Sequence, residues 1–369
     1  LAGRRGRGLP VAHSSFCIVW AMAAAAAAAA ARVGRVRRRS SSRESSPLMR
    51  DDGDRAKKRR QRPVVARRIW VLIVVAAIVI YFLFLCLPLA SLWKASRGTV
   101  SLEFGGAVTP HPDKVDRGGE DAYFYSSAIR AFAVADGVGG WNEQGVNPGL
   151  FSRALLQHVW DAFTEYPGIT PVAAMRKALG KVRARQIQGS STVVLGVLGK
   201  DNVLTVSNLG DSGLLLLRKQ SGSQGYTKLF KTPEQQHQFN FPYQVALDAH
   251  ASDPPESAET TTHPLRPGDL IIAGSDGLFD NLYVSEIVNE VSTTAVKSLN
   301  ELAANLVQKA HEFALLGEKG GRSPFGDNAR AAGKRWPGGG KLDDIVVVVA
   351  RVVEAKVPEH FDSNLAPPV

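Results

Sequence analysis

Short apolar runs, each bounded by glycine, aspartate or asparagine, recur along the chain after residue 98. Their length and their turn-forming flanks predict β-strands. The predicted strands are Ala131–Ala135, Thr192–Leu198, Val203–Val206, Leu214–Leu217, Leu270–Ala273 and Ile345–Ala350. Between them, apolar residues at helical spacing predict helices at Leu150–Phe163, Pro171–Arg185 and Ser298–Leu316. Since the strands come in consecutive sets rather than alternating with helices, the pattern favours an α+β fold with antiparallel sheets covered by helices.

One apolar run is longer than any strand. Residues 69–93 contain 25 positions without a charged side chain. As a helix with a rise of about 1.5 Å per residue, this run would span roughly 37 Å, more than the roughly 30 Å hydrocarbon core of a bilayer. We interpret it as a single transmembrane helix, with a buried core helix as the alternative.

The segment 1–68 is basic and of low complexity. It holds 18 Lys and Arg but only 4 Asp and Glu, and no acidic residue precedes Glu44. This Arg-, Ser- and Ala-rich composition is typical of an organelle transit peptide, and a low-complexity leader without a targeting role fits equally well. Met22 is a candidate start. Because basic residues cluster at 50–68, the positive-inside rule places the N-terminus on the cytoplasmic or matrix side of a membrane.

The charge and the cysteines of the remaining chain exclude several classes of function. Of 45 basic and 34 acidic side chains, 27 and 30 remain after residue 68, so this part has a small negative charge. A folded domain of that kind does not bind nucleic acid through a basic surface. The two cysteines are Cys17 and Cys86, so residues after 93 form no disulfide or zinc-thiolate site and offer no thiolate nucleophile.

Four acidic residues lie where apolar runs meet turns: Glu120, Asp136, Asp276 and Asp343. Any one of them is explained by turn formation, but turns do not explain acids at the ends of several strongly apolar strands. Mg²⁺ and Mn²⁺ prefer oxygen ligands that converge from separate backbone segments. The chain is therefore predicted to be a metal-dependent enzyme.

Six short motifs appear in an order that resembles the type 2C (PPM) metal-dependent Ser/Thr protein phosphatases. They are Gly119–Ala122, Ala135–Gly140, Gly189–Val193, Asn208–Gly213, Ser275–Asn281 and Asp343–Ile345. The resemblance covers roughly residues 105–354. Further motifs resemble the mitochondrial branch of that family: Asp136–Trp141, Gln236–Gln244 and Ser323–Phe325 with Gly338–Lys341.

The resemblance implies a four-layer α/β/β/α sandwich of two antiparallel sheets flanked by helices. This catalytic domain would occupy residues 98–355, before a tail of residues 356–369. Two Mn²⁺ or Mg²⁺ ions would be bridged by Asp136. Asp276 and Asp343 would complete one ion, and Glu120 with the Gly137 carbonyl would hold the other. The resemblance also places a third, weaker metal at Asp211, where a hairpin turn is an equally good interpretation.

The function implied is hydrolysis of phosphoserine and phosphothreonine in protein substrates. Two divalent ions lower the pKa of a bound water toward about 7, and the water attacks in line without a phosphoenzyme. The alternative is a catalytically silent binding module of the same fold, tethered to a membrane. The predicted location is a single-pass membrane protein, with a mitochondrial membrane favoured.

The chain departs from the family pattern at two positions. Val138 stands where many relatives have a histidine, so the general acid would be a metal-bound water, His237 or His111. The phosphate-binding arginine of relatives falls on Asp116, and the neighbouring Arg117 is either its catalytic substitute or a solvated loop charge.

Two further segments are candidates for contacts with substrate. The alternating Phe239, Phe241 and Tyr243 predict either a substrate-facing wall or a half-buried strand edge. The long Gly-rich segment Gly317–Gly340 is a candidate substrate or partner flap.

Overall fold

The computed structural model describes residues 71, 74–81, 99–220, 222, 225–293 and 298–355. The chain divides into two compact units, Leu1–Leu89 and Ala90–Val369. The predicted leader 1–68 and the tail 356–369 lie outside the described residues.

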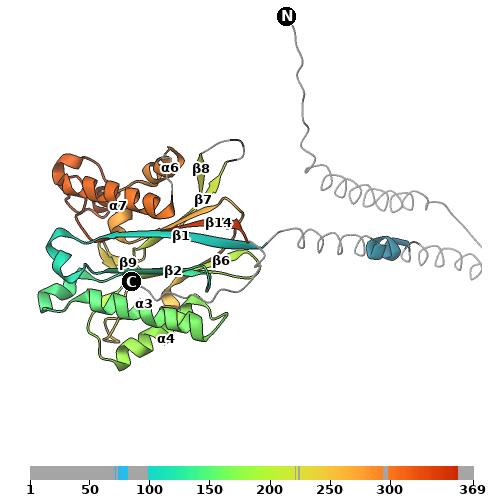
Figure 1. Ribbon diagram of the computed structural model, residues 1–369, viewed down its shortest axis with the longest axis horizontal. Helices are drawn as coiled ribbons and strands as arrows, with labels where there is room; N and C mark the ends of the chain where they lie inside the picture. Colours follow the sequence, from blue (N-terminus) through green and yellow to red (C-terminus); the bar gives the residue numbers. More distant parts are fainter. Residues whose placement is uncertain are drawn as a thin grey trace, which may run out of the picture. The chain divides into compact units, whose positions relative to one another are not determined.

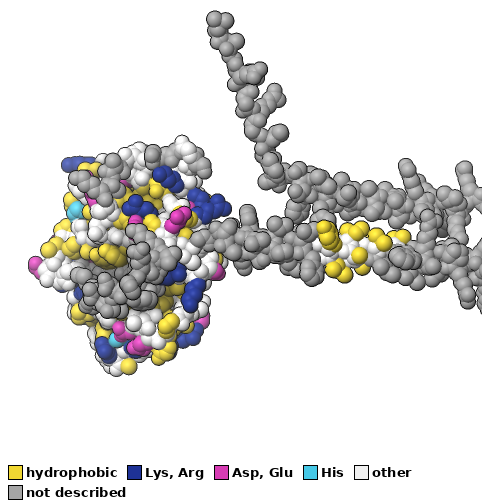
Figure 2. All heavy atoms as spheres, turned by 45° about the vertical axis from the view of Figure 1, so that its right-hand side comes forward, with side chains coloured by type: hydrophobic (Ala, Val, Ile, Leu, Met, Phe, Trp, Pro, Cys, Tyr) yellow, Lys and Arg dark blue, Asp and Glu magenta, His cyan; other side chains and the backbone are white. Residues whose placement is uncertain are grey.

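Only part of the predicted transmembrane span is described. Residue 71 and residues 74–81 are helical, and their apolar side chains are exposed (Figure 2). Within the ranges that the structure describes, no helix is both long enough and apolar enough to cross a bilayer. The span 69–93 therefore stays a prediction.

Two five-stranded antiparallel sheets form the centre of the second unit (Figure 1). The first sheet has the order β1 (Val100–Thr109), β14 (Ile345–Glu354), β13 (Leu270–Gly274), β7 (Gly213–Lys219), β8 (Tyr226–Lys231). The second has the order β12 (Glu259–Pro264), β6 (Val203–Leu209), β5 (Val193–Leu198), β3 (Ala131–Asp136), β2 (Asp121–Ser126). All six strands predicted from the apolar runs are present, and the prediction of antiparallel sheets is confirmed.

Helices cover the outer face of each sheet, which confirms the four-layer architecture (Figure 1). The second sheet packs against α3 (Pro148–Glu165) and α4 (Pro171–Ala184). The first packs against α5 (Asp276–Phe279), α6 (Val284–Thr293) and α7 (Leu299–Leu315).

Short elements complete the unit. Among its described residues, the remaining helix is α8 (Pro324–Ala331), and the 3₁₀ turns are η1 (Pro112–Arg117), η2 (Gly139–Gln144), η3 (Pro255–Ser257) and η4 (Gly317–Gly320). The short strands are β4 (Ser190–Ser191), β9 (Gln236–Gln238), β10 (Phe241–Pro242) and β11 (Val245–Ala246). The segment 317–340 therefore carries η4 and α8 rather than being a loop without secondary structure.

Central strands are buried on both faces. In β14, Val346 and Val348 belong to the core between the sheets, while Ile345 and Val347 belong to the core under the helices. A strand with two buried faces needs no polar side, which explains why these runs are continuously apolar rather than alternating.

The strand ends bring the acidic residues to one edge of the sandwich. Asp121 begins β2 and lies opposite Asp136, the last residue of β3. In the other sheet, β13 ends just before Ser275, whose Oγ accepts from the Val346 N–H at 3.1 Å. The same hydroxyl donates to Asp121 Oδ2 at 2.7 Å, which joins the two sheets at this edge.

Candidate active site

A cavity of about 210 Å³ opens at this edge. It is lined by Asp136, Gly137, Val138, Gly139, Gly140, Thr192, Asp211, Asn240, Pro242, Asp276, Lys341 and Asp343. Four of the residues predicted to bind metal, Asp136, Gly137, Asp276 and Asp343, are thus brought together from far-apart parts of the sequence. Asp211, the site of the weaker third metal in the resemblance, also lines it.

Gly137 allows two strand ends to meet. A Cβ at this position would lie 2.9 Å from the Glu120 carbonyl oxygen and 3.0 Å from the Pro148 backbone, so a larger residue would push these segments apart. The Gly137 N–H donates to the same Glu120 carbonyl at 3.1 Å. The glycine therefore fixes Glu120 next to the end of β3.

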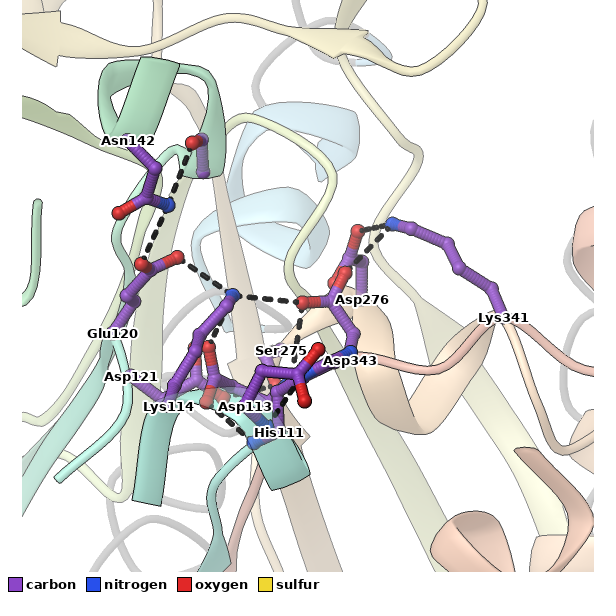
Figure 3. A network of polar contacts seen from close by, with 12 residues as sticks. His111, Asp113, Lys114, Glu120, Asp121, Asn142, Ser275, Asp276, Lys341 and Asp343 are labelled. Atoms are coloured by element: carbon purple, nitrogen blue, oxygen red, sulfur yellow. Dashed lines mark hydrogen bonds and ion pairs between the residues drawn. The ribbon is translucent and has the colours of Figure 1, made fainter. Parts of the chain in front are cut away.

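The Glu120 carboxylate is fully buried but does not line the cavity. Its Oε2 accepts from Lys114 Nζ at 2.7 Å, and its Oε1 accepts from Asn142 Nδ2 at 2.8 Å and from Arg117 Nη2 at 2.9 Å (Figure 3). Arg117, predicted as a catalytic residue, is 36% exposed and also lies outside the cavity lining. Within the described residues, the Arg117 side chain contacts Glu120.

Two lysines that were not predicted as site residues, Lys114 and Lys341, lie among the carboxylates (Figure 3). Lys341 Nζ is 2.5 Å from Asp276 Oδ2, 3.1 Å from Asp343 Oδ2 and 3.2 Å from Asp280 Oδ2. Lys114 Nζ lies 2.8 Å from Asp344 Oδ2 and 3.6 Å from Asp343 Oδ1, in addition to its contact with Glu120. Asp343 therefore lies between two ammonium groups.

Burial and repulsion between neighbouring carboxylates disfavour the charged form of several acidic residues in the site. Burial, followed by repulsion from Asp121, raises the pKa of Asp136 well above its usual range. Burial and the neighbouring Asp276 raise the pKa of Asp211 to about 7. At Asp343 burial also acts to raise the pKa, but attraction by Lys341 and Lys114 outweighs it and holds the pKa below the usual value. The charged forms of Asp136 and Asp211 would therefore be stabilised by nearby positive charge, and the charged form of Asp343 is already stabilised by Lys341 and Lys114.

The donor set fits a hard divalent cation in kind, because it consists of carboxylate oxygens from several elements. Asp276 Oδ1, which belongs to this set, and Asp121 Oδ1, which does not line the cavity, are buried and have no hydrogen-bond partner within the described chain. In the described ranges, however, no three Asp, Glu, His or Cys side chains are gathered into a ready ligand cage. The types of residue therefore suit a divalent cation, and Lys341 and Lys114 contact some of the same carboxylate oxygens.

The histidines named as alternative proton donors lie outside the cavity lining. His237 Nε2 is 3.0 Å from Asp253 Oδ1, and its ring stacks on Tyr243. The His111 side chain accepts from the Asp113 N–H. Val138, which stands in place of the family histidine, lines the cavity without a proton to give.

The hairpin of β9 and β10 forms one wall of the cavity through Asn240 and Pro242. Phe239 packs against Phe325 of α8 with ring centroids 5.0 Å apart. Phe241 is half exposed, at 49%. Phe239, Phe241 and Tyr243 do not line the cavity, so the aromatic pattern fits the strand-edge interpretation.

Comparison with known proteins identifies the family. A scan against models of known protein families found no match. Probable protein phosphatase 2C 80 of Arabidopsis thaliana is 40% identical over 262 residues, which cover 70% of this chain and 60% of that protein. Probable protein phosphatase 2C 26 of the same plant is 38% identical over 288 residues, covering 74% of this chain and 91% of that protein. The chain belongs to the protein phosphatase 2C family.

A solved structure supports the same assignment to the phosphatase 2C family. The X-ray structure of the photosystem II phosphatase PBCP is 35% identical, with a TM-score of 0.61, and the match covers 68% of this chain and 98% of that chain. The phosphatase 2C fold predicted from the ordered motifs is thereby confirmed. This chain nevertheless spans less than two thirds of the length of probable protein phosphatase 2C 80.

Proposed function

We propose that this phosphatase 2C family member hydrolyses phosphoserine and phosphothreonine in proteins and that its activity depends on two Mn²⁺ or Mg²⁺ ions. The observation that carries the proposal is the convergence of Asp136, Asp211, Asp276 and Asp343 on one cavity. Burying carboxylates that repel each other costs stability. A silent binding module would gain nothing from this loss of stability, whereas an enzyme that depends on divalent cations requires these carboxylates close together.

Asp136 would contribute to the binding of both ions. Asp276 and Asp343 would complete the coordination of one ion, and Glu120 with the Gly137 carbonyl would complete the other. When bound, the ions supply positive charge for the phosphate and lower the pKa of a water toward about 7.

The chain's own residues hold and orient the reactants. The backbone segment from Gly137 to Gly140 lines the cavity with little side-chain volume, which leaves room for a phosphoryl group. The Arg117 guanidinium uses Nη2 for Glu120, and we propose that its exposed remainder binds a phosphate oxygen of the substrate. Since Val138 has no proton to donate, the leaving group takes its proton from water.

Metal removal tests the proposed function. The full chain should release phosphate from a phosphothreonine peptide when Mn²⁺ is supplied, and excess EDTA should abolish this release because the carboxylates alone cannot neutralise a phosphate. Restoring Mn²⁺ should restore the rate. Phosphate release that persists in EDTA would contradict the metal-dependent mechanism, and no release with Mn²⁺ would favour the silent binding module.

We further propose that residues 69–93 tether the enzyme to a membrane, with a mitochondrial membrane favoured by the resemblance and by the basic leader. The support is the uncharged run of 25 residues between Arg68 and Lys94. In organelle fractions the full chain should stay in the pellet after alkaline carbonate extraction, and deletion of 69–93 should move it to the supernatant. Recovery of the full chain in the supernatant would contradict the tether. Protease added to intact organelles would then show which side the catalytic unit faces.

A further inference from the structure

The two lysines of the site, whose side chains are largely shielded from solvent, make their shortest contacts with different predicted metal ligands. Lys341 contacts Asp276 and Asp343, the two carboxylates assigned to one ion in addition to the bridging Asp136. Lys114 lies 2.7 Å from Glu120, the carboxylate assigned to the other ion, and at a longer distance of 3.6 Å from Asp343. The shortest contact of each ammonium group with a predicted ligand thus belongs to a different metal position (Figure 3).

A divalent ion and an ammonium group compete for the same oxygen lone pairs. Asp276 Oδ2 lies 2.5 Å from Lys341 Nζ, so an ion coordinated by this oxygen would be too close to the ammonium for both charges to stay. The same holds for Glu120 Oε2, which is 2.7 Å from Lys114 Nζ. Both lysine side chains are largely shielded from solvent, with 17% exposure for Lys341 and 14% for Lys114, so water weakens this competition little.

Lys341 has a second position available close by. Asp280, which is not among the predicted ligands, already lies 3.2 Å from Lys341 Nζ, and the ring of Phe325 lies 5.4 Å away. When an ion takes Asp276 and Asp343, the ammonium group can keep its charge paired with Asp280. The side chain therefore needs only a short displacement, without losing all compensation.

We propose that Lys341 and Lys114 are built-in counter-cations that compete with the two metal ions, one lysine for each position, and thereby set the metal affinity of the site. This inference rests on the proposed metal-dependent function. It adds that the affinity for divalent ions is held below what the carboxylates alone would provide.

Replacing each lysine by methionine tests the proposal, because methionine has a similar length and no charge. If the lysine-bound arrangement is favoured by about ten to one, its removal should tighten the apparent affinity about tenfold. Lys341→Met should tighten one Mn²⁺ site and Lys114→Met the other. The free Mn²⁺ signal in electron paramagnetic resonance, titrated with the full chain, measures both affinities without any assay of activity.

A matched control and a second variant complete the experiment. Lys309→Met removes a lysine of α7 that pairs with Glu290 at 3.0 Å and does not line the cavity, and it should leave both affinities unchanged. Lys341→Arg keeps the charge and can grip two carboxylate oxygens at once, so it should weaken Mn²⁺ binding. If Lys341→Met does not fold, Lys341→Arg decides: equal or tighter binding would overturn the proposal.

The outcomes separate this inference from the proposed function. Unchanged or weaker Mn²⁺ binding in the folded methionine variants would overturn the role of the lysines while leaving the phosphatase intact. A wild-type chain that binds no Mn²⁺ would overturn the metal centre and the competition together. Mn²⁺ binding without phosphate release would refute the proposed hydrolysis alone.

Discussion

Replacing Asp136 by asparagine should reduce Mn²⁺-dependent phosphate release by about 10²- to 10³-fold, the size of effect found when one electrostatic group is removed from an active site. Asp136 lines the cavity at the end of β3 and is the one residue predicted to bridge both ions. An amide of the same shape keeps the packing but removes the negative charge that both proposed ions would share. Steady-state rates of phosphate release from a phosphothreonine peptide, measured at several Mn²⁺ concentrations, check this.

The same substitution should raise the melting temperature in the presence of a chelator. Burial and repulsion from Asp121 raise the pKa of Asp136, which means that the folded protein disfavours the charged form. A raised pKa makes the wild type gain stability as the pH falls through that pKa, because the folded state then binds a proton that the unfolded state does not. Asp136→Asn removes this gain, so its stability should depend less on pH.

Asp248→Asn serves as the control for both effects. Asp248 is exposed and lies outside the cavity lining, so its substitution should change neither the rate of phosphate release nor the melting temperature in chelator. An Asp136→Asn variant with wild-type activity would contradict the bridging role. A lower melting temperature in chelator would contradict the electrostatic argument, even if activity were lost.

The acidic half of the site could be predicted because its residues are tied to strand ends. Asp136 and Asp343 adjoin runs that are apolar at nearly every position, and such runs are buried wherever the fold places them. Once the strands are antiparallel and lie in two stacked sheets, their ends can lie only at one of the two edges of the sandwich. Local sequence therefore carried the information about these carboxylates.

The basic half of the site carried no such signal. Lys114 lies in η1 and Lys341 follows three glycines, and a lysine in a charged or Gly-rich turn is usually solvated. Whether its side chain turns inward depends on the path of the loop. The local hints were that Lys341 ends the Gly338–Lys341 motif and stands two residues before Asp343, and that Lys114 stands six residues before Glu120.

Two of the elements that were not predicted contain glycine or lie in a Gly-rich segment. β1 contains Gly105 and Gly106, and a Cβ at Gly105 would lie 2.2 Å from the Leu299 backbone. Glycine is needed there for the close approach of α7 rather than for a bend. In the Gly-rich segment 317–340, α8 was not predicted, although Ser323 followed by Pro324 is a good helix start. The Ser323 hydroxyl accepts a hydrogen bond from the Gly326 N–H.

Replacing Phe132 by alanine should lower the free energy of unfolding by about 3–5 kcal/mol, the usual cost of a buried phenylalanine. Phe132 is fully buried in the core between the two sheets. Its cross-strand partner is Gly196, and a Cβ there would lie 2.2 Å from the Phe132 ring. The ring thus fills space that a glycine leaves open. Urea unfolding followed by tryptophan fluorescence measures the loss, with the half-exposed Phe241→Ala as control, for which less than about 1 kcal/mol is expected.

The pairing of ring and glycine gives a sharper version of this test. Gly196→Ala alone should destabilise the protein by about 1–3 kcal/mol, because the added methyl group overlaps the ring. In the Phe132→Ala background the same methyl group enters the space left by the ring, so its cost should largely disappear. Simple additivity of the two substitutions would show that Phe132 and Gly196 do not share this space, and would contradict the register of β3 and β5 described above.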